Sequence, residues 1–225
     1  MTDNNENILR DCQLASLGKM LAGYSHELKN HLAIINESAG LMGDLLEMGI
    51  IDDEQSIQRF KKIISVIEER INQANTMAKH MSSFAHKMDI PDSNFDVNEL
   101  LNEEFAFLDR FFWIKSVSVQ KKLQSELPAV CNNPSLLQFV IFTYIHKIVA
   151  GIESGGEIAL SSQMQGKNIL IIIDAPNLSA LTIDQDSCSP DAAAIKYALN
   201  KMDIAIMEET LADDRHKTTL TIPTT

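Results

Sequence analysis

The sequence predicts an α+β protein in which a two-helix hairpin forms a dimeric four-helix bundle and is followed by an α/β sandwich domain. Apolar residues recur at alternating steps of three and four through residues 14–45 and 57–88, and this pattern stops at Pro91. Beyond the proline, helical and alternating segments follow one another with short turns. We therefore expect a helical hairpin at residues 1–90 and an α/β domain at residues 91–225.

The two periodic segments have the heptad spacing of helices that pair along a seam. Gly49 and the acidic turn at residues 51–54 form a short connection between them, which suits an antiparallel hairpin. Further apolar residues lie beside the seam and widen it beyond that of a two-stranded coiled coil: Leu32, Leu46, Ile63 and Val66. Pairing of two chains would bury this surface, so a homodimer is predicted.

The second half reads as helices that interleave with strands. Helices are expected at residues 95–112, 134–152 and 191–202, and strands at residues 117–123, 157–164, 169–173 and 217–222. Turn residues separate these segments, notably Gly155-Gly156 and Gly166. A mixed sheet under helices is the arrangement that this order predicts.

Composition narrows the possible partners. The 225 residues are 45% hydrophobic, which is enough for real cores, and the net charge of −12 disfavours nucleic acid and anionic membranes. The N-terminus lacks the layout of a signal peptide and no apolar run approaches the roughly 20 residues of a membrane span, so we expect a cytoplasmic protein. The three cysteines are dispersed and are expected to be reduced thiols.

Two histidines in the first periodic segment differ in their heptad positions. With Leu21 and Leu28 at a positions, His26 falls at the outermost f position and His31 falls at a d position that faces the bundle. A zinc site of the HExxH type does not fit, because five residues correspond to about 140° around a helix. The two imidazoles cannot share one ion, and no metal is expected in this segment.

Residues 14–35 resemble the box of sensor histidine kinases that contains the phosphorylated histidine. The matching residues are Gly18, Ala22, Gly23, His26, Glu27, Asn30 and Leu32. His31 stands where the family usually has proline. The resemblance implies a dimerisation and histidine-phosphotransfer hairpin with His26 as phosphoacceptor.

The neighbours of His26 are expected to assist it. Glu27 is placed to accept a hydrogen bond from one ring nitrogen and so leave the other nucleophilic. Asn30 occupies the position that can orient a hydrolytic water in the family. Lys29, Gly23 and Leu32 are expected to contact the partner protein.

Landmarks of the kinase ATP-binding domain follow at residues 95–101, 127–130, 136–140, 155–156 and 219–223. The nucleotide-binding positions depart from the family pattern. Thr143 and Lys147 replace the two asparagines of the magnesium-holding box, and lysine has no acceptor lone pair for Mg²⁺. Asp174 remains from the adenine-binding box, but its two glycines are replaced, and residues 178–195 contain no glycine for a phosphate-binding loop. We expect a vestigial nucleotide site at these positions and loss of ATP binding.

The sequence is thus similar to the dimeric histidine phosphotransferases of bacterial phosphorelays. This similarity implies that His26 carries a phosphoryl group between aspartates of response regulator receiver domains. The chain itself would bind no cofactor, since Mg²⁺ is expected from the receiver. Two alternatives stay open: an ATP-dependent histidine kinase with divergent boxes, and a pseudokinase-like regulator or phosphatase of a response regulator.

Overall fold

The computed structural model describes residues 2–49, 54–176, 189–211 and 215–224, and the chain divides into two compact units. The α/β unit comprises Met1–Met20 and Phe84–Thr225, and the hairpin unit comprises Leu21–Ser83. This grouping differs from the sequence-based division at residue 90, because the first 20 residues pack with the second half of the chain.

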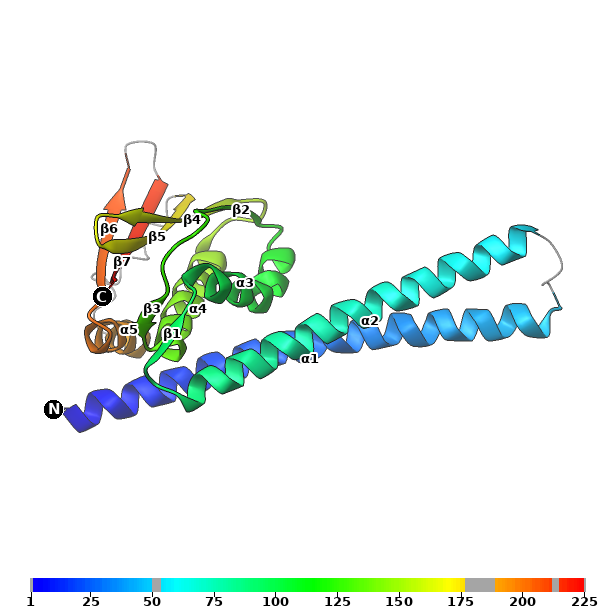
Figure 1. Ribbon diagram of the computed structural model, residues 1–225, viewed down its shortest axis with the longest axis horizontal. Coiled ribbons are helices and arrows are strands. Elements are labelled where there is room, and N and C mark those ends of the chain that lie inside the picture. Colours follow the sequence, from blue (N-terminus) through cyan, green and yellow to red (C-terminus); the bar gives the residue numbers. More distant parts are fainter. Residues whose placement is uncertain (1, 50–53, 177–188, 212–214, 225) are drawn as a thin grey trace. The chain divides into compact units, whose positions relative to one another are not determined.

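Two long helices supply the hairpin unit and extend into the α/β unit. They are α1 (Thr2–Glu47) and α2 (Glu54–Asp89), as Figure 1 shows. After the end of α1, Gly49 has a φ of 66°, a left-handed conformation that glycine adopts without strain, and its N–H donates to the Leu46 carbonyl at 3.1 Å. The two expected helices are confirmed, and residues 50–53, which include most of the predicted acidic turn, lie outside the described residues.

The apolar seam of α2 is only partly covered within one chain. Ile57, Ile64 and Ile71, which are spaced by seven residues, are 47%, 42% and 43% exposed. Met77 is buried on the same helix. A heptad-spaced apolar stripe therefore remains open along α2.

The first five turns of α1 bury a different set of residues from the one that the heptad pattern predicts. Leu9, Cys12, Ser16 and Met20 are buried, whereas Leu14 is 58% exposed. These turns belong to the α/β unit and contact its helices. The residues that are buried are therefore those that face α4 and α5, and not those of the heptad seam.

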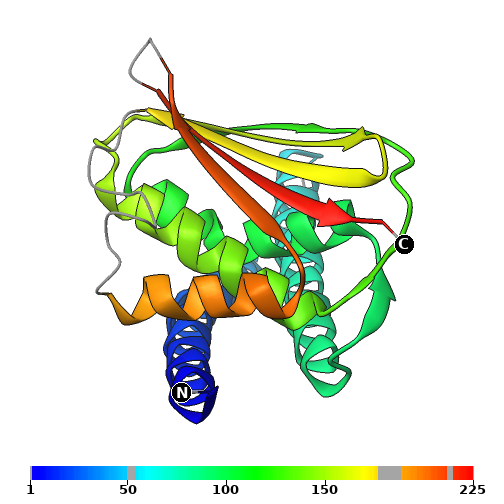
Figure 2. The same ribbon diagram turned by 90° about the vertical axis from the view of Figure 1, so that its left-hand side faces the viewer.

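The α/β unit has two layers, a five-stranded sheet and a layer of helices on one of its faces (Figure 2). The sheet order is β2-β4-β5-β7-β6, in which only the β2–β4 pair is parallel. The strands of this sheet are β2 (Ser118–Leu123), β4 (Glu157–Gln165), β5 (Asn168–Pro176), β6 (Ala205–Thr210) and β7 (Arg215–Pro223). The helices are α3 (Val97–Ile114), α4 (Pro134–Gly151) and α5 (Pro190–Lys201).

Each helix of the α/β unit begins at a capping side chain. Asp96 accepts hydrogen bonds from two backbone N–H groups at the start of α3, Asn133 accepts one from Leu136, and Ser189 accepts one from Ala192. A proline follows the cap of α4 and of α5, where its missing N–H costs nothing. The expected helices and strands of this half are all present.

Three strands were not predicted. β1 (Ser93–Phe95) and β3 (Val130–Asn132) form a separate two-stranded sheet, and β6 forms one edge of the larger sheet. The first two have three residues each, too few for an alternating pattern to emerge. None of the helices in the described ranges is long and apolar enough to cross a bilayer.

Candidate functional site

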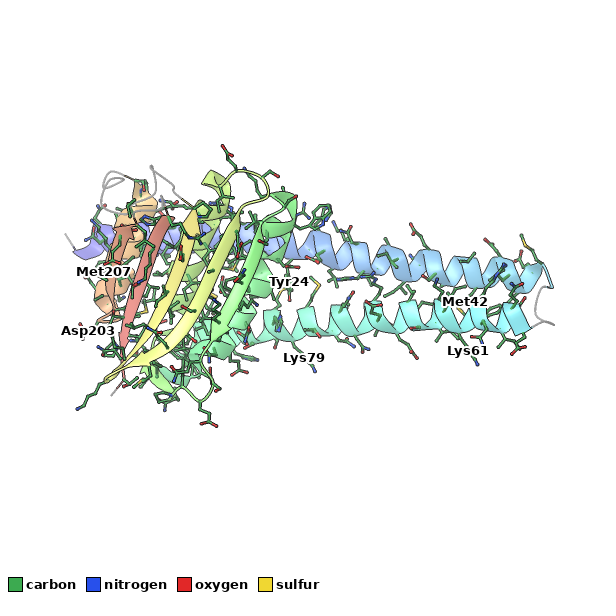
Figure 3. All side chains as sticks on the ribbon, turned by 90° about the horizontal axis from the view of Figure 1, so that it is seen from above. Tyr24, Met42, Lys61, Lys79, Asp203 and Met207 are labelled. Carbon is green, nitrogen blue, oxygen red and sulfur yellow. The ribbon has the colours of Figure 1, made fainter. Side chains whose placement is uncertain are left out.

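Tyr24 fixes the rotation of α1 just before His26. Its buried side chain, labelled in Figure 3, comes from α1. The Tyr24 hydroxyl donates a hydrogen bond to the carbonyl oxygen of Met77 on α2, at 2.7 Å. Successive residues of a helix are rotated by about 100°, so a side chain two residues further points to the opposite side. His26 is exposed, which agrees with the outer heptad position predicted for it.

Asn30 contacts the imidazole ring from one helical turn further along α1. Its amide nitrogen lies 3.3 Å from Nδ1 of His26. An asparagine amide has a donor and an acceptor in nearly equivalent positions. If the amide is rotated, Oδ1 accepts the hydrogen of Nδ1, and the lone pair of Nε2 is then free for nucleophilic attack.

The ring contact expected of Glu27 is made by Asn30 instead. Glu27 is half-buried, and among the described residues no hydrogen bond joins it to His26. The helical spacing explains this difference, because residues four apart share a face while adjacent residues do not.

The residues expected to dock a partner differ in accessibility. Lys29 is exposed and Leu32 is 52% exposed, so both present surface close to His26 in the sequence. Gly23 is buried and offers little surface in this chain for the contact expected of it. His31 is buried as its d position predicts, and its Nδ1 has no hydrogen-bond partner in the part of the chain that the structure describes. Only His26 of these two histidines is open to a partner.

The α/β unit contains the residues expected at a nucleotide site. Thr143 is buried on α4, and its hydroxyl lies 3.1 Å from the hydroxyl of Ser16 on α1. Lys147 follows one turn later on α4 and is half-buried. The face of α4 that carries these two positions therefore lies against the beginning of α1, a contact that the sequence did not reveal.

Asp174 does not lie with Thr143 and Lys147. Its neighbours on β5, Ile173 and Ala175, are fully buried, so by strand alternation Asp174 faces the other side of the sheet. There its Oδ1 accepts a hydrogen bond from Nε of Arg215 at 2.7 Å. The sheet separates the carboxylate from α4, and the three residues expected to share a nucleotide site are not brought together.

A buried polar cluster occupies the inner face of the sheet, close to Asp174 along the strands. The Tyr144 hydroxyl on α4 donates to Glu208 at 2.9 Å and lies 3.1 Å from Nε2 of His216 and within hydrogen-bond reach of Thr218. Burial raises the pKa of Tyr144, and the charge of Glu208 raises it further. The antiparallel register sets His216 opposite Ala175. In the sequence, the alternation expected of a strand at residues 217–222 was the signal that could have placed His216 and Thr218 on the inward face.

Part of the expected phosphate-binding region lies outside the described residues. Residues 177–188 fall there, including Leu178 and most of the glycine-free stretch. Within the described part of the chain, no group of three or more His, Cys, Asp or Glu side chains is arranged to hold a metal ion.

The hairpin followed by a five-stranded α/β unit is a histidine kinase-like fold. No protein-family model matches the chain. The catalytic domain of histidine kinase ThkA superposes with a TM-score of 0.53 at 12% identity, over 60% of this chain and 97% of that one. Histidine kinase AdeS of Acinetobacter baumannii gives 0.50 at 12% identity, over 88% and 97%.

A third similar structure is histidine kinase ThkA in complex with the response regulator protein TrrA. It has a TM-score of 0.50 and 14% identity, and the match covers all of this chain and 66% of that chain. At such low identities the likeness establishes the fold alone.

Proposed function

We propose that this protein is a histidine phosphotransferase of a cytoplasmic two-component phosphorelay, with His26 carrying the phosphoryl group between receiver-domain aspartates. The observation that carries this proposal is the exposed imidazole of His26 with Asn30 at its Nδ1. An exposed nucleophile on a helix can meet the acyl phosphate of a separate domain. The response regulator bound to histidine kinase ThkA, a protein with this fold, supports the choice of partner.

In the proposed reaction, Nε2 of His26 attacks the phosphorus of the aspartyl phosphate in line. The N–P bond forms as the P–O bond to the aspartate breaks, and the carboxylate leaves with the bonding pair. With the Asn30 amide rotated so that Oδ1 faces the ring, the hydrogen on Nδ1 stays in place and is donated to Oδ1, which steadies the positive ring of the phosphohistidine. Transfer to the second receiver reverses these steps.

The chain's own contribution is then positioning. The receiver's Mg²⁺ and lysine would neutralise the phosphoryl oxygens, so no metal needs to be held by this chain. Lys29 and Leu32 supply an exposed cation and an exposed apolar side chain for docking. Glu27 lies next to His26 in the sequence and would act on the ring only after its side chain rotates.

We infer that the working form is a homodimer. The open stripe of Ile57, Ile64 and Ile71 on α2 has the spacing of a coiled-coil seam, and Leu14 and Leu21 on α1 are likewise exposed. A monomer would leave these large apolar side chains in water, whereas a second copy of the hairpin would cover them.

Loss of ATP-dependent kinase activity is part of the proposal. The Asp174 carboxylate is engaged by Arg215 on the outer face of the sheet, and Thr143 is bonded to Ser16. Neither group is placed to hold a nucleotide together with Lys147. The degenerate domain is therefore proposed as a scaffold.

A second candidate is a phosphatase of a response regulator. Asn30 favours it, because an exposed amide one turn from His26 has the donor and acceptor needed to orient a water. In that case the receiver loses phosphate and His26 never carries it.

The test follows radiolabel from a phosphorylated receiver domain, and separately from ATP, onto the wild type, His26→Gln and the matched control His86→Gln, whose ring is also exposed. We expect acid-labile label from the receiver on the wild type and the control and none on His26→Gln. Label from ATP alone would identify a kinase. Loss of receiver label without label on the protein would identify a phosphatase.

A further inference from the structure

We propose that residues 6–20 of α1, here the cap segment, are an internal cap of the α/β unit. In this role they occupy the face of α4 that carries Thr143 and Lys147, and the capped arrangement is the working form of the protein. Figure 2 shows these N-terminal turns beside α5 and α4. The inference goes beyond phosphotransfer, since it assigns a task to a segment outside the hairpin unit.

The cap segment is attached at its beginning to the end of α5. The carboxylate of Glu6 accepts hydrogen bonds from the Tyr197 hydroxyl at 2.9 Å and from Nζ of Lys201 at 3.1 Å. These two hydrogen bonds lower the pKa of Glu6. Because these side chains are exposed, the contact contributes little to stability, and its main effect is to position the cap segment.

Burial holds the cap segment along its length. Leu9 and Met20 are each 2% exposed, and Cys12 between them is buried beside Asp191 at the start of α5. Burial, helped by the negative charge of Asp191, raises the pKa of the Cys12 thiol to about 11. Apolar side chains at this spacing form one face of a helix, and that face is directed at the α/β unit.

Its last turns lie on α4. The buried hydroxyls of Ser16 and Thr143 are 3.1 Å apart, and Lys147 is close enough to Cys12 for its charge to act on the thiol. Burial lowers the pKa of the half-buried His146 ring, and the positive charge of Lys19 lowers it further. The Ser16–Thr143 contact thus places α1 against this face of α4, and a ligand that approaches Thr143 must first displace Ser16.

The test is disulfide trapping in the full-length protein. Cys12→Ala, Cys131→Ser and Cys188→Ser provide a background without thiols, into which Ser16→Cys and Thr143→Cys are introduced. Their hydroxyls are near enough for a disulfide after small adjustments. The matched control is Ala15→Cys with Thr143→Cys, because Ala15 is exposed and rotated away.

We expect the Ser16–Thr143 pair to form an intrachain disulfide at least about tenfold faster than the control pair, as docking raises the effective concentration of the two thiols. Equal rates, or cross-links only between chains, would overturn the proposal. A measurement without substitutions is amide hydrogen exchange of the wild type. Protection at residues 9–20 that matches α4 supports the cap, whereas exchange as fast as at a frayed terminus contradicts it.

The claim that the capped form works rests on the proposed phosphotransfer. The oxidised pair should accept label from a phosphorylated receiver as the reduced pair does. Transfer only after reduction would show that the cap must open, which refutes the inference. Absence of transfer in both states, and in the wild type, would refute the proposed function and leave the trapping result standing.

Discussion

Nδ2 of Asn30 lies 3.3 Å from Nδ1 of His26, and both side chains are exposed on the same face of α1. The two residues are four apart, the spacing at which helical side chains meet. In the proposed mechanism the amide at Nδ1 selects which ring nitrogen keeps its hydrogen.

Asn30→Leu should slow the proposed phosphotransfer to His26 by about 10–100-fold, the size of effect that removing an orienting partner of a metal-ligating histidine has. Asn30→Asp keeps an oxygen that accepts the hydrogen of Nδ1, so it should retain most of the rate. Single-turnover transfer from a labelled receiver measures both. Equal rates in the wild type and Asn30→Leu would show that the amide does not act on the ring.

Tyr24→Phe should lower the free energy of unfolding by about 1 kcal/mol, because it removes one buried hydrogen bond to the Met77 carbonyl. Urea denaturation followed by circular dichroism measures the change. Tyr197→Phe is the control, since its hydroxyl bonds the exposed Glu6 and should cost less. A larger loss for the control would contradict the importance assigned to Tyr24.

Ile64→Asp should dissociate the proposed homodimer, because a charge would be buried in the seam between two copies. The neighbouring Lys62→Asp introduces the same charge at an exposed f position and should leave the dimer intact. Sedimentation over a range of protein concentrations reports the mass of each variant. A monomeric wild type would rule out the proposed assembly.

Asp174→Asn should change stability by no more than about 1 kcal/mol, since the carboxylate and Arg215 form a partly exposed pair. Tyr144→Phe should cost about 1–3 kcal/mol, because it leaves buried partners on the inner face unsatisfied. Thermal and urea unfolding of both variants measure the difference. The reverse order would mean that Asp174 faces α4 after all.

Glu104→Gln should stabilise the protein increasingly as pH rises. The carboxyl is fully buried without a hydrogen-bond partner in the described structure, and burial raises its pKa well above 4.5. A folded pKa above the unfolded one contributes stability below pH 4.5 that is lost as pH rises toward the folded pKa. Urea midpoints at pH 5 and pH 8 should therefore diverge in favour of the variant.

Glu103→Gln is the control for this pH dependence. Glu103 is paired with Lys87, so its loss should destabilise the protein at pH 8. A constant difference in stability between Glu104→Gln and the wild type at both pH values would refute the raised pKa of Glu104.

The hairpin and the exposure of His26 were predictable, because a heptad pattern sustained over many turns fixes which side of a helix faces outward. The placement of Asp174 was not. A shift of one residue in a strand moves a side chain to the other face of the sheet. The motif alone did not determine whether Ile173 or Asp174 points inward, and in the structure it is Ile173.

The burial of Leu9, Cys12, Ser16 and Met20 was also missed, for a different reason. The heptad repeat that includes Leu14 and Leu17 continues into the hairpin, so the sequence indicated a single buried face along α1. In the structure the first turns of α1 bury a different face. A second face becomes visible only when α4 and α5, more than 100 residues away, are present beside it.

The contact between Ser16 and Thr143 has a consequence for how such a chain diverges. Because residue 143 packs against residue 16 of the same chain, a substitution at position 143 is tolerated when it fits position 16, and contact with a ligand no longer constrains it. Across related sequences the two positions should therefore change together, a larger residue at one accompanying a smaller residue at the other.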